Sequence, residues 1–317
     1  MILLWGVSED GPLRAVREAL DARGVASLFL DQFDATTFDC RIATAGGGGQ
    51  IRLGERDIDL DEVQAVYLRP YPGRRVTELL EVDAALADRT ERFDDALLLW
   101  TEMTPALVVN RPSAMASNSS KPLQAHLAEG FGFATPPTLL TSDRDAAAAF
   151  WALHGAVIYK STSGVRSRVA RLDAAVLDRL SAPACPIQLQ AWIEGIDWRV
   201  HVVGDAVFAC TVESDAVDYR YPDSEAPKIT EASLPAAIAE RCLRLARGLA
   251  FSLTGIDLRQ TPDGRWIFFE ANPSPGFTYY EDATGAPIAA TLAALLVQAE
   301  RPKAEARGIL LPMAQDR

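Results

Sequence analysis

The hydrophobic and polar positions at the start of the chain alternate between the patterns of strands and helices. An apolar run over residues 2–7 predicts a strand, and the Ser-Glu-Asp-Gly-Pro turn at 8–12 suits the start of a helix. Apolar residues then recur at helical spacing as far as Gly24, and residues 26–30 predict a second strand. This order is typical of a βαβ unit in a parallel sheet. No GxGxxG follows the first strand, so a dinucleotide site is not indicated.

A tract of glycines at 46–49 raises the question of a phosphate-binding loop. Alternating segments flank it at 41–44 and 50–53, and no helix start follows, so we favour a hairpin turn. Residues 63–68 predict another strand. The pattern over 76–103 predicts one long amphipathic helix.

The remaining pattern continues to mix helices and strands after a boundary at Arg111-Pro112. A length of 317 residues favours two or three packed lobes, and we expect domains at 1–112, 113–190 and 191–317. Helices are expected over 119–130, 145–153 and 235–250. Strands are expected over 107–110, 138–140, 156–160, 254–259 and 266–270, with two more within 187–213. The fold class is therefore α/β with α+β lobes.

The net charge and the length of the apolar runs argue against nucleic acids and membranes as partners. The formal net charge is -12, which argues against steering of DNA or RNA, so an anionic ligand must meet a local cluster of Arg and Lys. No apolar run approaches the roughly 20 residues that span a bilayer, and no membrane partner is expected. The first residues show neither a basic leader nor a cleavage site, so we expect a cytoplasmic protein.

Cysteines and histidines are scattered along the chain. We expect each cysteine to be a small buried hydrophobic residue rather than a disulfide partner or metal ligand: Cys40, Cys185, Cys210 and Cys242. The histidines show no ligand spacing and give no local support to a Ser-His-Asp or Cys-His site: His126, His154 and His201.

Two carboxylates and an amide are expected to meet on one hairpin. Asp257 lies in an apolar strand, and the turn at 263–264 brings the chain back so that Glu270 lies beside it. The period of two places Asn272 on the same face as Glu270. Such hard oxygen ligands suit Mg²⁺. A solvated hairpin edge is the alternative, but Glu270 ends a Trp-Ile-Phe-Phe run, where an unpaired carboxylate is costly.

Cations precede this acidic set. Lys160 ends an apolar strand, and the Ser-Thr-Ser-Gly run at 161–164 has backbone amides suited to folding over phosphates. Arginines follow at 166, 168 and 171, and Lys121 lies upstream near a helix start. Each lysine alone reads as a solvated surface residue. Together with the acidic set, they indicate a nucleotide site.

In this order, the motifs resemble the ATP-grasp superfamily over about 110–298. The matching elements are Lys121, Lys160 with residues 161–164, Gln-Ala-Trp-Ile-Glu-Gly-Ile-Asp-Trp-Arg at 190–199, and Asp257 with Glu-Ala-Asn-Pro at 270–273. The resemblance implies an ATP-grasp fold with an N-terminal Rossmann-like βαβ pre-ATP-grasp domain at 1–112. A central lid subdomain at 113–190 and a C-terminal subdomain at 191–317 would follow.

The resemblance also implies roles for individual residues. ATP phosphates would be held by Lys121, Lys160, Ser161, Thr162, Ser163 and Gly164. Adenine would meet Gln190, Ala191, Trp192 and Ile193, with Glu194 or Asp197 near the ribose. One or two Mg²⁺ ions, replaceable by Mn²⁺, would be held by Asp257, Glu270 and Asn272. Arg199 and Arg220 would face an acyl phosphate or the substrate carboxylate. The implied activity is that of an ADP-forming carboxylate–amine or carboxylate–alcohol ligase, which needs no side-chain nucleophile.

Residues 7–10 and 211–220 are similar to graspetide synthetases, which join Glu or Asp side chains of a precursor peptide to Ser, Thr or Lys. Asp218 and Arg220 match that family's Asp-x-Arg element, which implies a substrate-binding role and a ribosomally made precursor peptide as partner. Residues 274–281 depart from the expected continuation. The alternative is a ligase like the ribosomal-protein glutamate ligases and glutathione synthase, acting on small molecules or a protein terminus.

Three further expectations stay open. Arg69, beside Tyr67 and Tyr71, either lines the acceptor cleft or is a surface arginine. A homodimer is implied because many relatives are dimers. An ATP-binding regulatory module without catalysis, or a phosphotransferase, competes with the ligase. The intact acidic set argues against the first, and the lack of a phosphoryl-accepting histidine context argues against the second.

Overall fold

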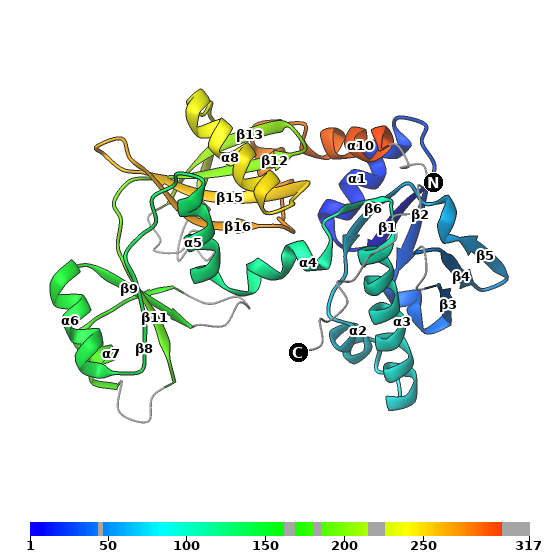
Figure 1. Ribbon diagram of the computed structural model, residues 1–317, viewed down its shortest axis with the longest axis horizontal. Helices are drawn as coiled ribbons and strands as arrows, with labels where there is room; N and C mark the ends of the chain where they lie inside the picture. Colours follow the sequence, from blue (N-terminus) through cyan, green and yellow to red (C-terminus); the bar gives the residue numbers. More distant parts are fainter. Residues whose placement is uncertain (44–46, 162–168, 180–184, 215–225, 300–317) are drawn as a thin grey trace, which may run out of the picture. The chain divides into compact units, whose positions relative to one another are not determined.

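The computed structural model describes residues 1–43, 47–161, 169–179, 185–214 and 226–299. It forms two compact units (Figure 1). The first contains Met1–Pro112 and the end of the last helix from Ala293, and the second contains Ser113–Leu292. Helices and strands alternate in both units, which confirms the α/β class.

A parallel sheet in the order β2-β1-β6-β7 forms the core of the first unit. Its strands are β1 (Ile2–Gly6), β2 (Ser27–Asp31), β6 (Ala65–Arg69) and β7 (Leu107–Val109). Helix α1 (Gly11–Asp21) joins β1 to β2, and the Asp10 carboxylate caps it by accepting from the Leu13 N–H at 2.9 Å. Every residue of β1 is buried. The expected βαβ unit is therefore confirmed.

A small antiparallel sheet accompanies it, made of β3 (Phe38–Ile42), β4 (Gly49–Leu53) and β5 (Arg56–Asp59). The β3–β4 pairing confirms a hairpin at the glycine tract, although residues 44–46 lie outside the described chain. Short 3₁₀ helices, η1 (Gln32–Thr37) and η2 (Leu60–Glu62), flank this sheet.

The single long helix expected over 76–103 is wrong. The structure has α2 (Gly73–Leu80) and then α3 (Ala84–Met103). Glu81 between them has φ 53°, in the left-handed region, and the Asp83 carboxylate starts α3 by accepting from the Leu86 N–H at 2.9 Å. Both helices have apolar residues at helical spacing, so the hydrophobic pattern alone does not reveal the break between them.

Buried Asp94 on α3 has an unusual environment. Its side chain is 6% exposed, and one carboxylate oxygen accepts from Gln32 Nε2 at 3.0 Å. Within the described residues the other oxygen has no hydrogen-bond partner. Burial raises the pKa of Asp94 to about 7. The folded state therefore binds a proton that the unfolded chain releases near pH 4.

We expect Asp94 to make stability fall as pH rises from about 4 to about 7, by up to about 4 kcal/mol, with no further loss above that range. Asp94→Asn keeps an acceptor for Gln32 without a buried charge, so this variant should be more stable than the native chain at pH 8. Urea unfolding at pH 5 and pH 8 measures the difference, with the exposed Asp21→Asn as control, because Asp21 does not contribute to the raised pKa of Asp94. An unchanged pH dependence in Asp94→Asn would contradict the assignment.

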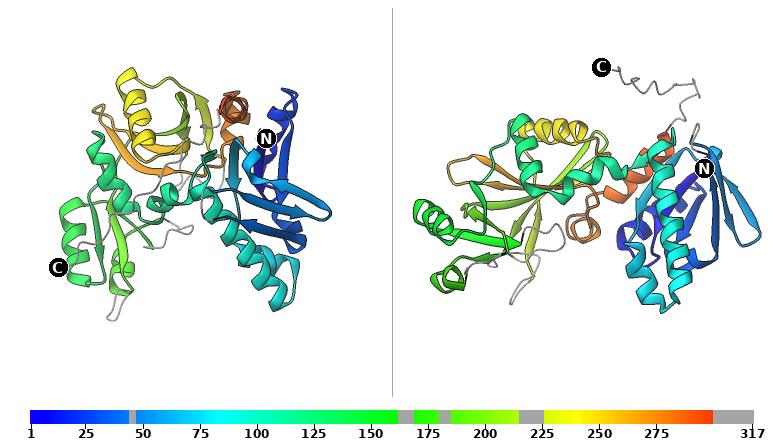
Figure 2. Two further views of the ribbon diagram at one scale, coloured as in Figure 1. Left: turned by 45° about the vertical axis from the view of Figure 1, so that its right-hand side comes forward. Right: turned by 60° about the horizontal axis from the view of Figure 1, so that its bottom comes forward.

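The second unit contains a sheet in the order β10-β9-β11-β8. Its strands are β8 (Thr138–Thr141), β9 (Val157–Ser161), β10 (Ala170–Arg171) and β11 (Ile187–Ala191). Helices α6 (Arg144–His154) and α7 (Ala174–Arg179) cover one face (Figure 2). There Ala147 and Val176 pack with Val157 and Leu189 of the strands.

An antiparallel sheet in the order β14-β13-β12-β15-β16 follows. It comprises β12 (Ile196–Val203), β13 (Ala206–Glu213), β14 (Lys228–Glu231), β15 (Leu253–Gln260) and β16 (Trp266–Asn272). Ala128 of α5 (Lys121–Gly130) and Cys242 of α8 (Ala236–Gly248) pack against Val200 and Phe268 of this sheet. The remaining helices are α4 (Pro112–Met115), η3 (Ala116–Ser119), α9 (Thr278–Thr284) and α10 (Ile288–Gln298).

The expectation of four buried cysteines is correct for two of them. Cys210 and Cys242 are buried, but Cys40 is half-buried and Cys185 is exposed. All four are free thiols. Among the described helices, none combines the length and the apolar character that crossing a bilayer requires.

Candidate functional site

The β15–β16 hairpin places two carboxylates directly opposite one another, as the sequence predicted. Asp257 pairs with Glu270 in the strand register. The register shifts between Asp257 and Leu258, so Phe269 is an extra residue on β16. Neighbouring strand residues normally point to opposite faces, but at this bulge both Phe269 and Glu270 line the same cavity.

Each carboxylate is paired with a cation from another element. Arg199 of β12 donates from Nη1 to Asp257 Oδ1 at 2.7 Å. Lys121, the first residue of α5, donates from Nζ to Glu270 Oε2 at 2.8 Å. Ser120 caps this helix start by accepting from the Leu123 N–H. The helix thus brings Lys121 to a residue that follows it by 149 positions in the sequence.

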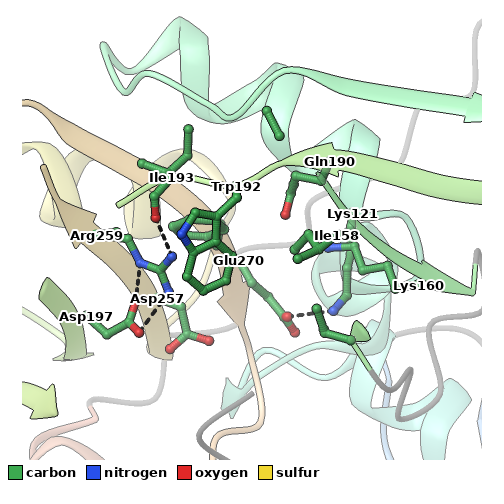
Figure 3. Close-up of a pocket in the computed structure, with 13 residues that line it drawn as sticks. Lys121, Ile158, Lys160, Gln190, Trp192, Ile193, Asp197, Asp257, Arg259 and Glu270 are labelled. Carbon is green, nitrogen blue, oxygen red and sulfur yellow. Dashed lines mark hydrogen bonds and ion pairs between the residues drawn. The ribbon is translucent and has the colours of Figure 1, made fainter. Parts of the chain in front are cut away.

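Asp257, Glu270 and Lys121 line a cavity between the two sheets of the second unit (Figure 3). Its lining residues are Lys121, Ile158, Lys160, Val169, Gln190, Ala191, Trp192, Ile193, Asp197, Asp257, Arg259, Phe269 and Glu270. Lys160, near the end of β9, is buried. A neighbouring cavity of about 480 Å³ shares Lys121, Lys160, Gln190 and Phe269 with the first. The structure therefore brings together both lysines, both carboxylates and the 190–193 segment.

Arg259 is a residue of this cavity that the sequence analysis missed. It forms two hydrogen bonds to the Asp197 carboxylate, each 2.8 Å long. Burial raises the pKa of Asp197, although the hydrogen bond and charge of Arg259 lower it. The sequence did contain a sign of this residue: Arg259 lies in the same apolar strand as Asp257, and a charged side chain in such a strand needs a partner.

Arg199 contacts Asp257 but is not among the described residues that line the cavity. Its guanidinium carbon lies 5.4 Å from the ring centre of Tyr280, and its Nε donates to His201 Nε2 at 3.4 Å. Burial, and then the charge of Arg199, hold the pKa of His201 well below its usual value. The imidazole is therefore neutral and able to accept this hydrogen bond.

The structure does not bring every expected residue into the cavity. Glu194 is exposed, and neither it nor Asn272 is among the described lining residues. Asn272 Oδ1 accepts from the Ser274 N–H at 2.9 Å. In the first unit, Arg69 is largely buried and paired with Asp10 at 2.8 Å, so it is not a surface arginine. The expected residues Thr162, Ser163, Gly164, Asp218 and Arg220 lie outside the described chain.

The donor set fits Mg²⁺. Asp257 and Glu270 present carboxylates across the hairpin at the cavity, whereas the Asn272 amide oxygen accepts from the Ser274 N–H and lies outside the described lining. Within the described residues no group of three or more His, Cys, Asp or Glu side chains gathers. A site with two carboxylates leaves coordination positions for water and phosphate oxygens, which Mg²⁺ prefers to keep.

Comparison with known proteins agrees with this geometry. Residues 127–296 match a family described as the RimK-like ATP-grasp domain. The ATP-grasp ligase PsnB, solved with a minimal precursor, is 28% identical, with a TM-score of 0.77 over 93% of this chain and 97% of that chain. A Chryseobacterium gregarium RiPP-associated ATP-grasp ligase, solved with ADP and a leader and core peptide, is 22% identical, with a TM-score of 0.80 over 95% of this chain and 99% of that chain.

More distant structures share the fold. D-alanyl-alanine synthetase A from Vibrio cholerae is 13% identical, with a TM-score of 0.62 over 94% of this chain and 97% of that chain. None of the curated proteins compared with this chain matches it. The ATP-grasp fold expected from the sequence is confirmed.

Proposed function

This chain belongs to the RimK-like ATP-grasp family, and we propose that it is an ATP- and Mg²⁺-dependent ligase. It would activate a carboxylate as an acyl phosphate and join it to a nucleophile with release of ADP. One observation carries the proposal: two lysines and two opposed carboxylates line a single cavity that the 190–193 segment also lines. Cations suited to phosphate and oxygen ligands suited to Mg²⁺ are therefore in one place.

The charges of the site suit attack of a carboxylate on the terminal phosphate of ATP. Lys121 and Lys160 would offset the charge of the phosphates. Asp257, Glu270 and Asn272 would hold Mg²⁺, which when bound supplies further charge neutralisation. Arg199, ion-paired to Asp257, would face the acyl phosphate. No side-chain nucleophile is required, because the second substrate attacks the activated carboxylate.

A peptide carboxylate is the substrate class we favour. PsnB, similar over 93% of this chain, is known in complex with a minimal precursor. We propose that this chain joins Glu or Asp side chains of a ribosomally made peptide to Ser, Thr or Lys. Asp218, Arg220 and Arg69 are the candidate peptide contacts, and a homodimer is the proposed assembly. The RimK-like family match favours an amino-acid ligase as the second candidate.

ADP release tests the proposal. The protein is incubated with ATP and Mg²⁺ and with amino acids, small peptides, or peptides rich in Glu, Asp, Thr and Ser, and products are weighed by mass spectrometry. ADP with loss of water from one peptide supports an intramolecular peptide ligase. A coupled product from two small molecules supports an amino-acid ligase. Tight ATP binding without ADP from any of them contradicts ligase activity and favours a regulatory module.

Lys160→Ala should weaken binding of Mg-ATP about tenfold or more, because a buried ammonium that meets phosphate contributes roughly 1.5–3 kcal/mol. Isothermal titration calorimetry measures the affinity. Lys228→Ala is the matched control, since Lys228 forms an exposed ion pair with Glu213 on β13. Unchanged ATP affinity in Lys160→Ala would reject the phosphate role.

A further inference from the structure

Arg259 on β15 holds two points of the 192–197 segment, Ile193 and Asp197, both of which line the cavity. Its Nε and Nη2 each donate to an oxygen of the Asp197 carboxylate at 2.8 Å. Its Nη1 donates to the carbonyl oxygen of Ile193 at 2.6 Å (Figure 3). The Arg259 side chain is 12% exposed and that of Asp197 is 26% exposed. The charged guanidinium is the donor in all three bonds, and two of them also have a charged acceptor, which makes them stronger than bonds between neutral groups.

The backbone is built to allow this arrangement. Asp197 and Arg259 are direct partners in the β12–β15 register. Gly195, which precedes β12, has φ +149°, and a Cβ there would lie 2.2 Å from the Gln260 carbonyl oxygen and 3.0 Å from Arg259 Cγ. The segment lies this close to β15 because residue 195 has no side chain.

Arg259 also contacts two aromatic side chains of the cavity. Its guanidinium carbon lies 4.9 Å from the ring centre of Trp192 and 5.2 Å from that of Phe269. Arg171, in β10, lies 4.7 Å from the ring centre of Trp192. Cation–π contacts of this kind hold an aromatic ring in place. Arg259 therefore contacts side chains that line the cavity as well as the backbone of Ile193, another lining residue.

The backbone hydrogen bonds show what this anchoring achieves. The N–H groups of Ala191 and Trp192 donate to the carbonyls of Pro137 and Ala156, each at 2.9 Å. The Ile193 carbonyl accepts from Arg259. The peptide group that carries the Ile193 N–H lies between these two anchored peptide groups. Within the described residues that N–H has no hydrogen-bond partner. Ile193 lines the cavity, and its N–H is held between these two anchored peptide groups.

A fixed N–H donor distinguishes the two purine bases. Atom N1 of adenine is an acceptor, whereas N1 of guanine carries a hydrogen and is a donor. An N–H held in one direction binds the first and opposes the second, since two donors facing each other leave both without a partner. A mobile segment would rotate to relieve that mismatch and lose the discrimination.

We infer that Arg259 is a positioning residue that sets selectivity for adenine over guanine by holding the 192–197 segment. This inference rests on the proposed nucleotide site and adds a determinant of which nucleotide that site accepts. Arg259 acts through Ile193, Asp197 and Trp192 rather than on the phosphates. Its loss should therefore change the preference between nucleotides, which loss of a phosphate contact would leave unchanged.

Calorimetric titration of the full chain with Mg-ATP and with Mg-GTP tests the inference. Arg259→Met should raise the Kd for ATP about tenfold or more and bring the ATP-to-GTP preference close to one. Arg259→Lys keeps the charge but cannot donate two parallel hydrogen bonds to Asp197, so the Kd for ATP and the ATP-to-GTP preference should change in the same direction by a smaller factor. Arg265→Met is the matched control, because Arg265 pairs with Asp263 on the exposed turn of the same hairpin, and it should leave both affinities unchanged.

Melting temperatures measured on the same samples separate positioning from general stability. A folded Arg259→Met chain with native preference would overturn the inference. Weakening of ATP and GTP by the same factor would also overturn it, because a purely structural role predicts that result. Where Arg259→Met does not fold, unchanged preference in Arg259→Lys decides against the inference. A native chain that binds neither nucleotide would instead overturn the proposed nucleotide site, and this inference with it.

Discussion

Glu270→Gln is expected to abolish ATP-dependent turnover, with a loss of at least about a thousandfold, while the chain keeps its fold. The substitution keeps the shape of the side chain and removes one negative charge. A Mg²⁺ ion would lose an anionic ligand opposite Asp257, and Lys121 would lose the partner that it now contacts at 2.8 Å. The Lys121 and Glu270 side chains are only 18% and 20% exposed, so the substitution leaves a largely buried ammonium, and we expect a measurable loss of stability in a chain that still folds.

ADP release at saturating ATP, measured over a range of Mg²⁺ concentrations, tests this expectation. Glu213→Gln on β13 is the matched control, because it makes the same isosteric change in an exposed ion pair with Lys228. The control should turn over at the native rate. Native turnover by Glu270→Gln at every Mg²⁺ concentration would remove Glu270 from the metal site.

The acidic hairpin could be predicted from the sequence because its determinants are local. The Asp263-Gly264 turn and two apolar strands fix which residues meet, and Asp257 does pair with Glu270. The bulge at Phe269 could not be predicted, since one extra residue leaves the pattern of apolar positions readable as a plain strand. Its effect is to bring an aromatic ring to the cavity beside the carboxylate.

The contacts of the arginines depend on long-range register. Arg259 meets Asp197 only because β12 and β15 pair with these residues opposite each other, and 62 positions separate them in the sequence. Periodicity selects neither residue, although Asp197 belongs to the motif at 190–199. Local patterns therefore predict the elements and the hairpin, whereas strand pairing across the sheet decides which charges are neutralised.

The ion pair between Arg199 and Asp257 depends on the absence of a side chain at Gly255. Gly255 lies on β15 beside Arg199 of β12, and a Cβ built on it would lie 2.1 Å from Arg199 Nη2 and 2.9 Å from the Cβ of Pro275. The guanidinium thus occupies space that any other residue at 255 would fill. There it is held by Asp257 and lies against the Tyr280 ring.

Gly255→Ala is therefore expected to reduce turnover by at least about a hundredfold with little change in ATP affinity, and to lower the melting temperature because the methyl group also meets Pro275. The end of an arginine side chain is flexible, so the fold accommodates the methyl group by displacing the guanidinium, which then leaves Asp257. Gly276→Ala is the control, because a Cβ at Gly276 would meet no atom within 4 Å. Adding Arg199→Ala to Gly255→Ala should cause little further loss, since both changes remove the same contact. Native turnover in Gly255→Ala would show that the position of this guanidinium does not matter to the chemistry, and Arg199 would lose its proposed role at the acyl phosphate.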